Sequence, residues 1–178
     1  DSFTLEEDKS QVVLLTADDP DFDELTFHLE IGPDFGTIDI VNGLATYTPN
    51  LNYFGQDSFT FYAADAEEIS NISTITLEIL PINDAPVITS QPILAAVEDE
   101  LYSYQIIAFD PENDVLVYEL DSFPDGMQID NDTGLITWTP IEGQLSSGEI
   151  IVTVEDSGED GALPFSQNFI IEVESVND

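Results

Sequence analysis

Cysteine and arginine are absent from the 178-residue sequence, and Lys9 is its one lysine, against 38 acidic residues. Without cysteine the chain can form no disulfide framework, zinc–thiolate site or cysteine nucleophile. A net charge of −37 at pH 7 excludes nucleic acid as a direct partner, because that binding depends on basic side chains that neutralise phosphates. The longest apolar runs, such as residues 12–15, are far too short to cross a bilayer, so direct membrane insertion is not expected.

The excess of carboxylates requires an explanation, because self-repulsion at this net charge destabilises a compact chain. Hydrophobic residues make up 42% of the sequence and aromatic residues 10%, which is enough for packed cores and argues against a disordered chain. A salt-rich environment would screen the repulsion. Bound calcium would instead use clustered acids as ligands, since the ion takes about six to eight oxygens. The calcium explanation predicts that the acids concentrate at particular positions.

The sequence repeats itself at an offset of 91 residues, which separates Glu7 from Glu98 and Asp65 from Asp156. Matching segments at this offset are 17–23 with 108–114 and 43–49 with 134–140. Near the C-terminus the offset grows to 94, through extra residues in a Gly/Ser-rich stretch where a loop tolerates insertion. The repeat indicates two domains of one fold. The sequence ends at the Asn-Asp pair with which a third repeat would begin, as expected for a segment of a longer tandem array.

Short strands are the dominant pattern in both repeats. Residues 73–80 alternate between polar and apolar side chains and are rich in β-branched residues. Turn signals such as Asn42-Gly43 recur about every 8–12 residues, and no stretch keeps a helical period. We therefore predict an all-β protein made of two tandem antiparallel β-sandwich domains of the immunoglobulin or cadherin type, 1–84 and 85–178.

The acidic residues of each repeat gather at three places that are distant in the sequence. They lie near the start of the repeat, after its second predicted strand and after its penultimate strand. These groups are 6–8, 19–23 and 65–68 in the first repeat, and 98–100, 110–114 and 156–160 in the second. Alternate acids suit a metal-binding loop, since every second side chain can turn to one side. An EF-hand is excluded, because Glu24 occupies the position that requires glycine.

Several motifs follow one another in a specific order. They occupy residues 46–50 and 81–86 in the first repeat, and 110–114 and 137–140 in the second. In this order they resemble the cadherin-like superfamily, including its secreted bacterial branches, over nearly the whole chain. The first repeat is similar to the tandem repeats of bacterial surface adhesins, and the C-terminal repeat resembles the dystroglycan-type cadherin-like domain.

The resemblance implies Ca²⁺ sites where successive domains meet. The ligands implied inside the chain are Glu7 from the first domain, Asn83 and Asp84 from the linker, and Asp110, Glu112 and Asp156 from the second domain. The ligands implied toward a preceding domain are Asp19, Asp21 and Asp65, and those toward a following domain are Glu98, Asn177 and Asp178. Pro81 stands where the family has a further acid, so we expect about one or two ions at the inner junction rather than the full set.

The resemblance favours a calcium-rigidified structural or adhesive module of a larger secreted or cell-surface protein, with neighbouring domains of the array as partners. An alternative is a carbohydrate-binding module of a secreted polysaccharide-acting protein, suggested by Tyr53, Phe54 and Trp138. Trp138 and Tyr47 occupy equivalent strand positions, which favours core packing for both. Homophilic adhesion is a third hypothesis. An enzyme is not expected, because the sequence has no nucleophile elbow and no phosphate-binding loop.

Overall fold

The computed structural model describes residues 1–156 and 162–176. The chain divides into two compact units, Asp1–Ile82 and Asn83–Asp178, called the first and the second unit below. The predicted all-β class with two tandem sandwiches is confirmed. The division after Ile82 lies close to the boundary predicted after Asp84. The described residues include no helix that is long and apolar enough to cross a membrane.

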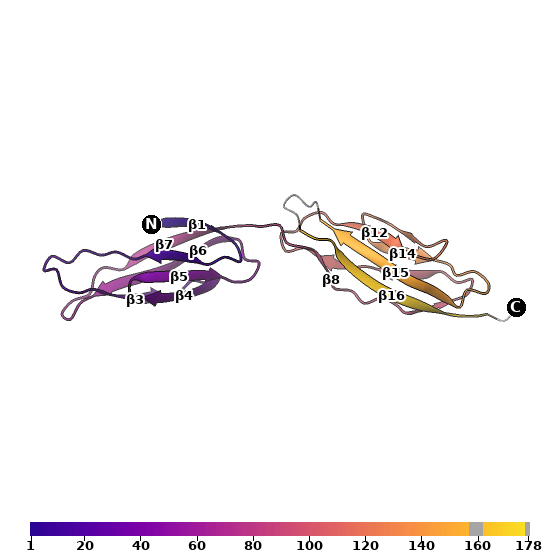
Figure 1. Ribbon diagram of the computed structural model, residues 1–178, viewed down its shortest axis with the longest axis horizontal. Helices are drawn as coiled ribbons and strands as arrows, with labels where there is room; N and C mark the ends of the chain where they lie inside the picture. Colours follow the sequence, from indigo (N-terminus) through magenta and orange to yellow (C-terminus); the bar gives the residue numbers. More distant parts are fainter. Residues whose placement is uncertain (157–161, 177–178) are drawn as a thin grey trace. The chain divides into compact units, whose positions relative to one another are not determined.

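The first unit packs a four-stranded sheet, β1-β7-β6-β3, against a three-stranded sheet, β2-β5-β4 (Figure 1). Its strands are β1 (Ser2–Glu6), β2 (Gln11–Leu14), β3 (Thr26–Ile31), β4 (Gly36–Val41), β5 (Leu44–Pro49), β6 (Gly55–Ala64) and β7 (Ser73–Leu80). β1 runs parallel to β7 and ends with Glu6 opposite Leu80, whereas the other neighbouring strands are antiparallel. This pairing places Glu7 at the point where the chain leaves β7.

Alternation along the strands buries one face of each sheet. In β7, Leu77 and Ile79 are buried while Thr76 and Glu78 are exposed. Tyr47 of β5 is fully buried in the same cluster as Leu77. Each large apolar side chain buried in this way stabilises the unit by about 1.5–3 kcal/mol. The polar members of β7, such as Thr76 and Glu78, are thereby left on the outer face.

The second unit repeats this architecture with a four-stranded sheet, β12-β15-β16-β9, a three-stranded sheet, β10-β14-β13, and a short β8-β11 ladder (Figure 1). Its strands are β8 (Val87–Ile88), β9 (Ala95–Val97), β10 (Tyr102–Gln105), β11 (Ala108–Phe109), β12 (Val117–Ser122), β13 (Gln128–Ile129), β14 (Leu135–Trp138), β15 (Ser146–Glu155) and β16 (Phe165–Glu174). β9 runs parallel to β16, as β1 does to β7. Glu98 therefore follows β9 as Glu7 follows β1.

Trp138 lies in the core of the second unit, where 1% of its surface is exposed. Its indole N–H donates to the Asp125 carbonyl at 3.3 Å. Tyr47, at the equivalent position of the first repeat, is also buried. Core packing of both rings is thus confirmed, and Trp138 has no exposed face on which a sugar could stack. Phe54, by contrast, is 38% exposed.

Candidate metal centre

The loop that follows β11 folds around the carboxylate of Asp110. Oδ1 of Asp110 accepts the backbone N–H groups of Glu112 and Asp114, both at 3.0 Å. Asn113 takes a positive φ of 64° and donates its N–H to the Asp110 carbonyl at 3.2 Å. Asp110 is 4% exposed, and its Oδ2 is buried without a hydrogen bond from any described residue. One carboxylate oxygen therefore shapes the loop while the other remains available to a ligand.

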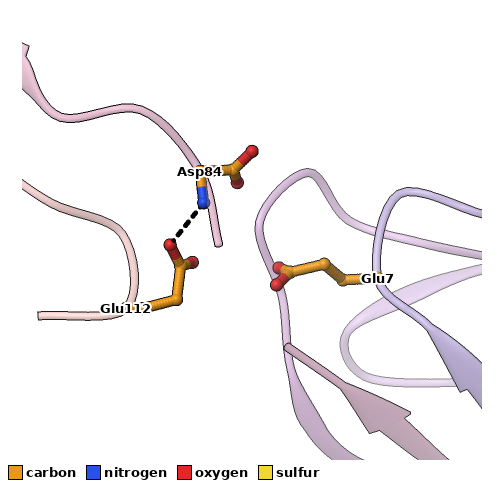
Figure 2. A group of neighbouring side chains, drawn as sticks. All are labelled: Glu7, Asp84 and Glu112. Atoms are coloured by element: carbon orange, nitrogen blue, oxygen red, sulfur yellow. Dashed lines mark hydrogen bonds between the residues drawn. The ribbon is translucent and has the colours of Figure 1, made fainter. Parts of the chain in front are cut away.

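Glu112 lies beside the linker residue Asp84. The backbone N–H of Asp84 donates to Oε2 of Glu112 at 2.9 Å (Figure 2), and carboxylate oxygens of the two residues lie within 4.8 Å of each other. Oε1 of Glu112 is buried, and no described residue donates a hydrogen bond to it. Burial raises the pKa of Glu112, the N–H of Asp84 opposes the rise, and the charges of Asp84 and Asp110 add to it. A cation at this position would offset both the free-energy cost of burying the charged carboxylate and the repulsion between the neighbouring carboxylates.

Asn83 and Asp156 complete this acidic group of the second unit. Asp156 directly follows β15 and is 9% exposed. The Asn83 side-chain amide donates from Nδ2 to Oδ2 of Asp156 at 3.2 Å. Since Nδ2 is the donor, the Asn83 carbonyl oxygen keeps its capacity as a metal ligand. The second unit thus brings together Asn83, Asp84, Asp110, Glu112 and Asp156.

Glu7 is fully buried in the first unit. Its backbone N–H donates to the Leu80 carbonyl at 2.9 Å, and Oε1 accepts the Ile82 N–H at 2.7 Å. The carboxylate therefore fixes the course of the chain as it leaves β7.

Glu98 has the same role in the second unit. Its Oε2 accepts the Val176 N–H at 3.0 Å, and its Oε1 accepts the Gly143 N–H at 2.5 Å. Both oxygens of this carboxylate already bind the backbone. The other two ligands predicted for this end, Asn177 and Asp178, lie outside the described residues.

The first unit has an acidic group of its own, called the acidic tip below, which consists of residues 19–23 and 65–68. Oδ1 of Asp19 accepts the N–H groups of Asp21 and Asp23 at 2.7 and 3.2 Å, as Asp110 does in its loop. Oδ1 of Asp65 accepts those of Glu67 and Glu68, both at 2.7 Å. These bonds, led by that from Glu68, lower the pKa of Asp65, and the Asp19 side chain contributes. A cavity of about 140 Å³ adjoins Asp19 and Asp65, so two of the three ligands predicted here lie together.

The chain itself supplies almost no positive charge to these groups. Lys9 is the one lysine, and its ammonium group contacts Glu6 at 2.5 Å at the surface. Burying carboxylates without a counter-charge is unfavourable. The donor set in the second unit consists of carboxylate and amide oxygens, which suit hard cations such as Ca²⁺ rather than softer transition metals. The residues present therefore fit calcium.

One structurally important acid was not predicted from the sequence. Asp57 begins the alternation of residues 57–61, in which Phe59 and Phe61 point into the core. An acid in phase with core residues signals a buried carboxylate that needs donors. The structure supplies these donors inside the first unit, away from the acidic tip.

Comparisons with known proteins agree with this architecture. A family model described as Bacterial Ig domain matches residues 1–78, and one described as Putative Ig domain matches residues 85–174. The second match covers half of the chain, so the chain belongs to the family described as Putative Ig domain. No curated protein sequence matches it.

Crystal structures of cadherin repeats share the fold of these immunoglobulin-like domains. Human protocadherin-24 EC1-2 matches with a TM-score of 0.63 and 17% identity, over 99% of this chain and 95% of that one. Human CDH23 EC21-23 matches with a TM-score of 0.61 and 16% identity, over 99% and 72%. An endo-fucoidan hydrolase of glycoside hydrolase family 107 matches at 0.43 and 22% identity, and the chain spans 28% of that enzyme's length. The predicted likeness to cadherin-like tandem repeats is confirmed at the level of the fold.

Proposed function

We propose that this chain is a calcium-binding and calcium-rigidified structural or adhesive segment of a larger secreted or cell-surface protein. The main support is the buried pair of oxygens, Oδ2 of Asp110 and Oε1 of Glu112, in a group of oxygen ligands that no lysine or arginine neutralises. Calcium provides the missing positive charge and accepts several carboxylates at once. The function is non-catalytic, and its partners are the neighbouring domains of a tandem array.

The ligand assignment follows the order of the chain. At the inner junction the ions would be shared by Glu7, Asn83, Asp84, Asp110, Glu112 and Asp156. Asp19, Asp21 and Asp65 would serve a preceding domain, and Glu98, Asn177 and Asp178 a following one. Because Glu98 already gives both oxygens to backbone N–H groups, we expect weaker calcium binding at that end.

The mechanism is thermodynamic linkage. An ion that binds only when the ligands of both units are assembled stabilises that arrangement by about 2.7 kcal/mol when free calcium is at 100 times its dissociation constant. Extracellular calcium modules bind at about 10⁻⁴–10⁻³ M, so the segment would stiffen outside the cell. A stiff array holds an attached adhesive or catalytic domain away from the surface.

Calcium titration by calorimetry, combined with small-angle scattering, tests the proposal. We expect millimolar calcium to bind the wild type and to increase its maximum dimension relative to EDTA. The Asp110→Asn variant should lose at least about tenfold in affinity, because one ligand charge is removed. Asp114→Asn is the matched control, since it removes the same charge from the same loop while its backbone N–H still binds Asp110. Equal affinities for both variants, or one maximum dimension in calcium and in EDTA, would overturn the proposal.

A further inference from the structure

The outer face of the four-stranded sheet in the first unit is rich in hydroxyl groups. Ser2 on β1 and Ser58 on β6 both pair with Thr76 on β7, and Thr60 pairs with Thr74 in the adjacent row. Thr4 extends the set on β1. All of these side chains face away from the core. Cross-strand pairing therefore places their hydroxyls side by side across three strands.

The equivalent face of the second unit has a different chemistry. Its exposed positions carry carboxylates on all three long strands of the sheet, namely Glu119 and Asp121 on β12, Glu149 and Glu155 on β15, and Glu172 and Glu174 on β16. The outer face of the first unit also carries Glu78 on β7 and Glu6 on β1, but no carboxylate interrupts the paired rows Ser2–Thr76–Ser58 and Thr74–Thr60. The fold does not require this chemistry, because the second unit forms the same sheet without it.

A groove of about 210 Å³ crosses this hydroxyl-rich face. Its lining includes Phe35, Gln56, Ser58, Thr74 and Thr76, with Asp34 as its one exposed carboxylate. The groove forms because β3 stops pairing with β6 at Ile31, opposite Thr60, and the chain then turns away toward β4. The start of β6 is thus left without a neighbouring strand on that side.

Asp57 and Tyr53 hold Phe35 in place at the edge of the groove. The Asp57 carboxylate is 7% exposed and accepts the N–H groups of Asp34 and Phe35 at 3.0 Å each. The Phe35 ring stacks on Tyr53, with ring centroids 4.3 Å apart and planes 5° apart, and the Tyr53 hydroxyl donates to the Gln56 carbonyl at 2.8 Å. Phe35 nevertheless remains 43% exposed. Such a fixed aromatic ring loses little conformational entropy when a ligand binds.

We propose that this groove binds a neutral sugar chain. The hydroxyls of Ser58, Thr74 and Thr76 make no hydrogen bond to any other described residue and can both donate and accept. Phe35 provides a flat apolar surface for the C–H face of a sugar ring. A concave site with an aromatic surface and a few placed polar groups is typical of small-ligand sites. The net charge of −37 repels acidic or sulfated glycans, so the sugar is uncharged.

This site goes beyond the proposed calcium function and does not depend on it. All of its lining residues belong to the first unit, and none is a predicted calcium ligand. Binding should therefore be the same in EDTA and in calcium, and each proposal can fail without the other.

Calorimetry on the full chain in EDTA tests the site with neutral hexasaccharides of glucose, xylose, mannose and galactose, and with hexaguluronate as the acidic probe. We expect at least one neutral probe to bind and hexaguluronate not to bind. Phe35→Ala and Thr76→Glu should each weaken binding by about tenfold or more, through loss of stacking and through an added charge. Thr4→Glu is the matched control, because it adds the same charge to the same face outside the groove lining.

Backbone amide shifts at residues 56–58 and 74–76 should move on titration, and circular dichroism of each variant checks that it is folded. Binding to none of the neutral probes, or equal loss in Thr76→Glu and Thr4→Glu, overturns the proposal. Sedimentation provides a further test. If the wild type dimerises and Thr76→Glu does not, the face is occupied by a second copy of the chain, and the sugar assignment is wrong.

Discussion

The acidic loops of the two units have the same pattern of internal hydrogen bonds, but their central carboxylates differ in burial. Asp19 and Asp110 each accept two N–H groups from their own loop, yet Asp110 is 4% exposed and Asp19 is only partly buried. In the second unit the backbone N–H of the linker residue Asp84 also donates to Glu112. Loops with the same hydrogen bonds therefore differ in how far they bury their carboxylates, so the loop sequence sets the shape but not the exposure.

A second difference concerns residue 57 and its equivalent 91 residues later. The first unit has Asp57 there, which also accepts the Tyr47 hydroxyl and the Ser58 N–H, both at 2.8 Å. Burial raises the pKa of Tyr47, and the hydrogen bond to Asp57 adds to the rise. The second unit has Gly148, which has no side chain and takes a positive φ of 69°. One sandwich therefore depends on a buried carboxylate that the other does without.

Replacing that carboxylate should produce the largest effect of the changes considered. Asp57→Ala leaves three backbone N–H groups and the Tyr47 hydroxyl without their acceptor, and we expect the first unit to lose about 3 kcal/mol or more of unfolding free energy. Urea unfolding followed by circular dichroism measures this loss. The one tryptophan, Trp138, lies in the second unit, so its fluorescence transition should stay in place.

Asp39→Ala serves as the control, because Asp39 is an exposed residue of the first unit and its removal changes the net charge equally. We expect it to change the stability by less than about 0.5 kcal/mol. If both variants unfold at the same urea concentration, the difference between the two sandwiches at this position has no energetic meaning.

The position of Asp57 shows how far sequence reasoning can go. Its phase with Phe59 and Phe61 indicates an inward-facing acid, because side chains alternate along a strand. Its donors, Asp34 and Phe35, lie 23 and 22 residues earlier, and no local pattern connects them to it. Contacts of this range depend on where β3 leaves the sheet, which follows from the packing of the whole unit.

The candidate metal centre shows the same limit. The offset of 91 residues predicts that Asp110 repeats the role of Asp19, and the loop hydrogen bonds agree. The sequence could not show that both oxygens of Glu98 bind backbone, since Gly143 is not near it in the chain. Burial depends on which distant segments cover a side chain, so it differs between sites with the same motif.

A smaller effect is expected when the stability of the two units is compared as a function of pH in calcium-free protein. Burial raises the pKa of Glu112 above its ordinary 4.5, so the folded second unit retains a proton that the unfolded chain has released. Lowering the pH from about 7 toward about 4.5 should therefore stabilise the second unit in EDTA, and raising the pH through the folded-state pKa should remove this gain. The melting of wild type and Glu112→Gln, followed by Trp138 fluorescence, measures the difference.

The first unit should not show this gain. Hydrogen bonds from the Glu68 and Glu67 N–H groups lower the pKa of Asp65 below its ordinary 3.8. Its contribution to stability is therefore present above that value and is lost as the pH falls through the lower folded-state pKa. A wild-type second unit whose melting temperature follows that of Glu112→Gln at every pH would contradict the proposed role of burial at Glu112.

The smallest expected change in stability concerns Phe22, in the loop between β2 and β3. Phe22 takes a positive φ of 65° and is 93% exposed, whereas Asn113 holds the equivalent position in the second unit at 64°. The left-handed region is unfavourable for a bulky side chain and tolerated by asparagine. Because the Phe22 ring is almost fully exposed, Phe22→Asn should stabilise the first unit by about 0.5–1 kcal/mol in urea unfolding followed by circular dichroism. Phe22→Ala is the control: it removes the ring but lacks the local hydrogen bonds of asparagine, so it should give less of this gain. A loss of stability in Phe22→Asn would show instead that the ring, and not the backbone, determines the conformation of this loop.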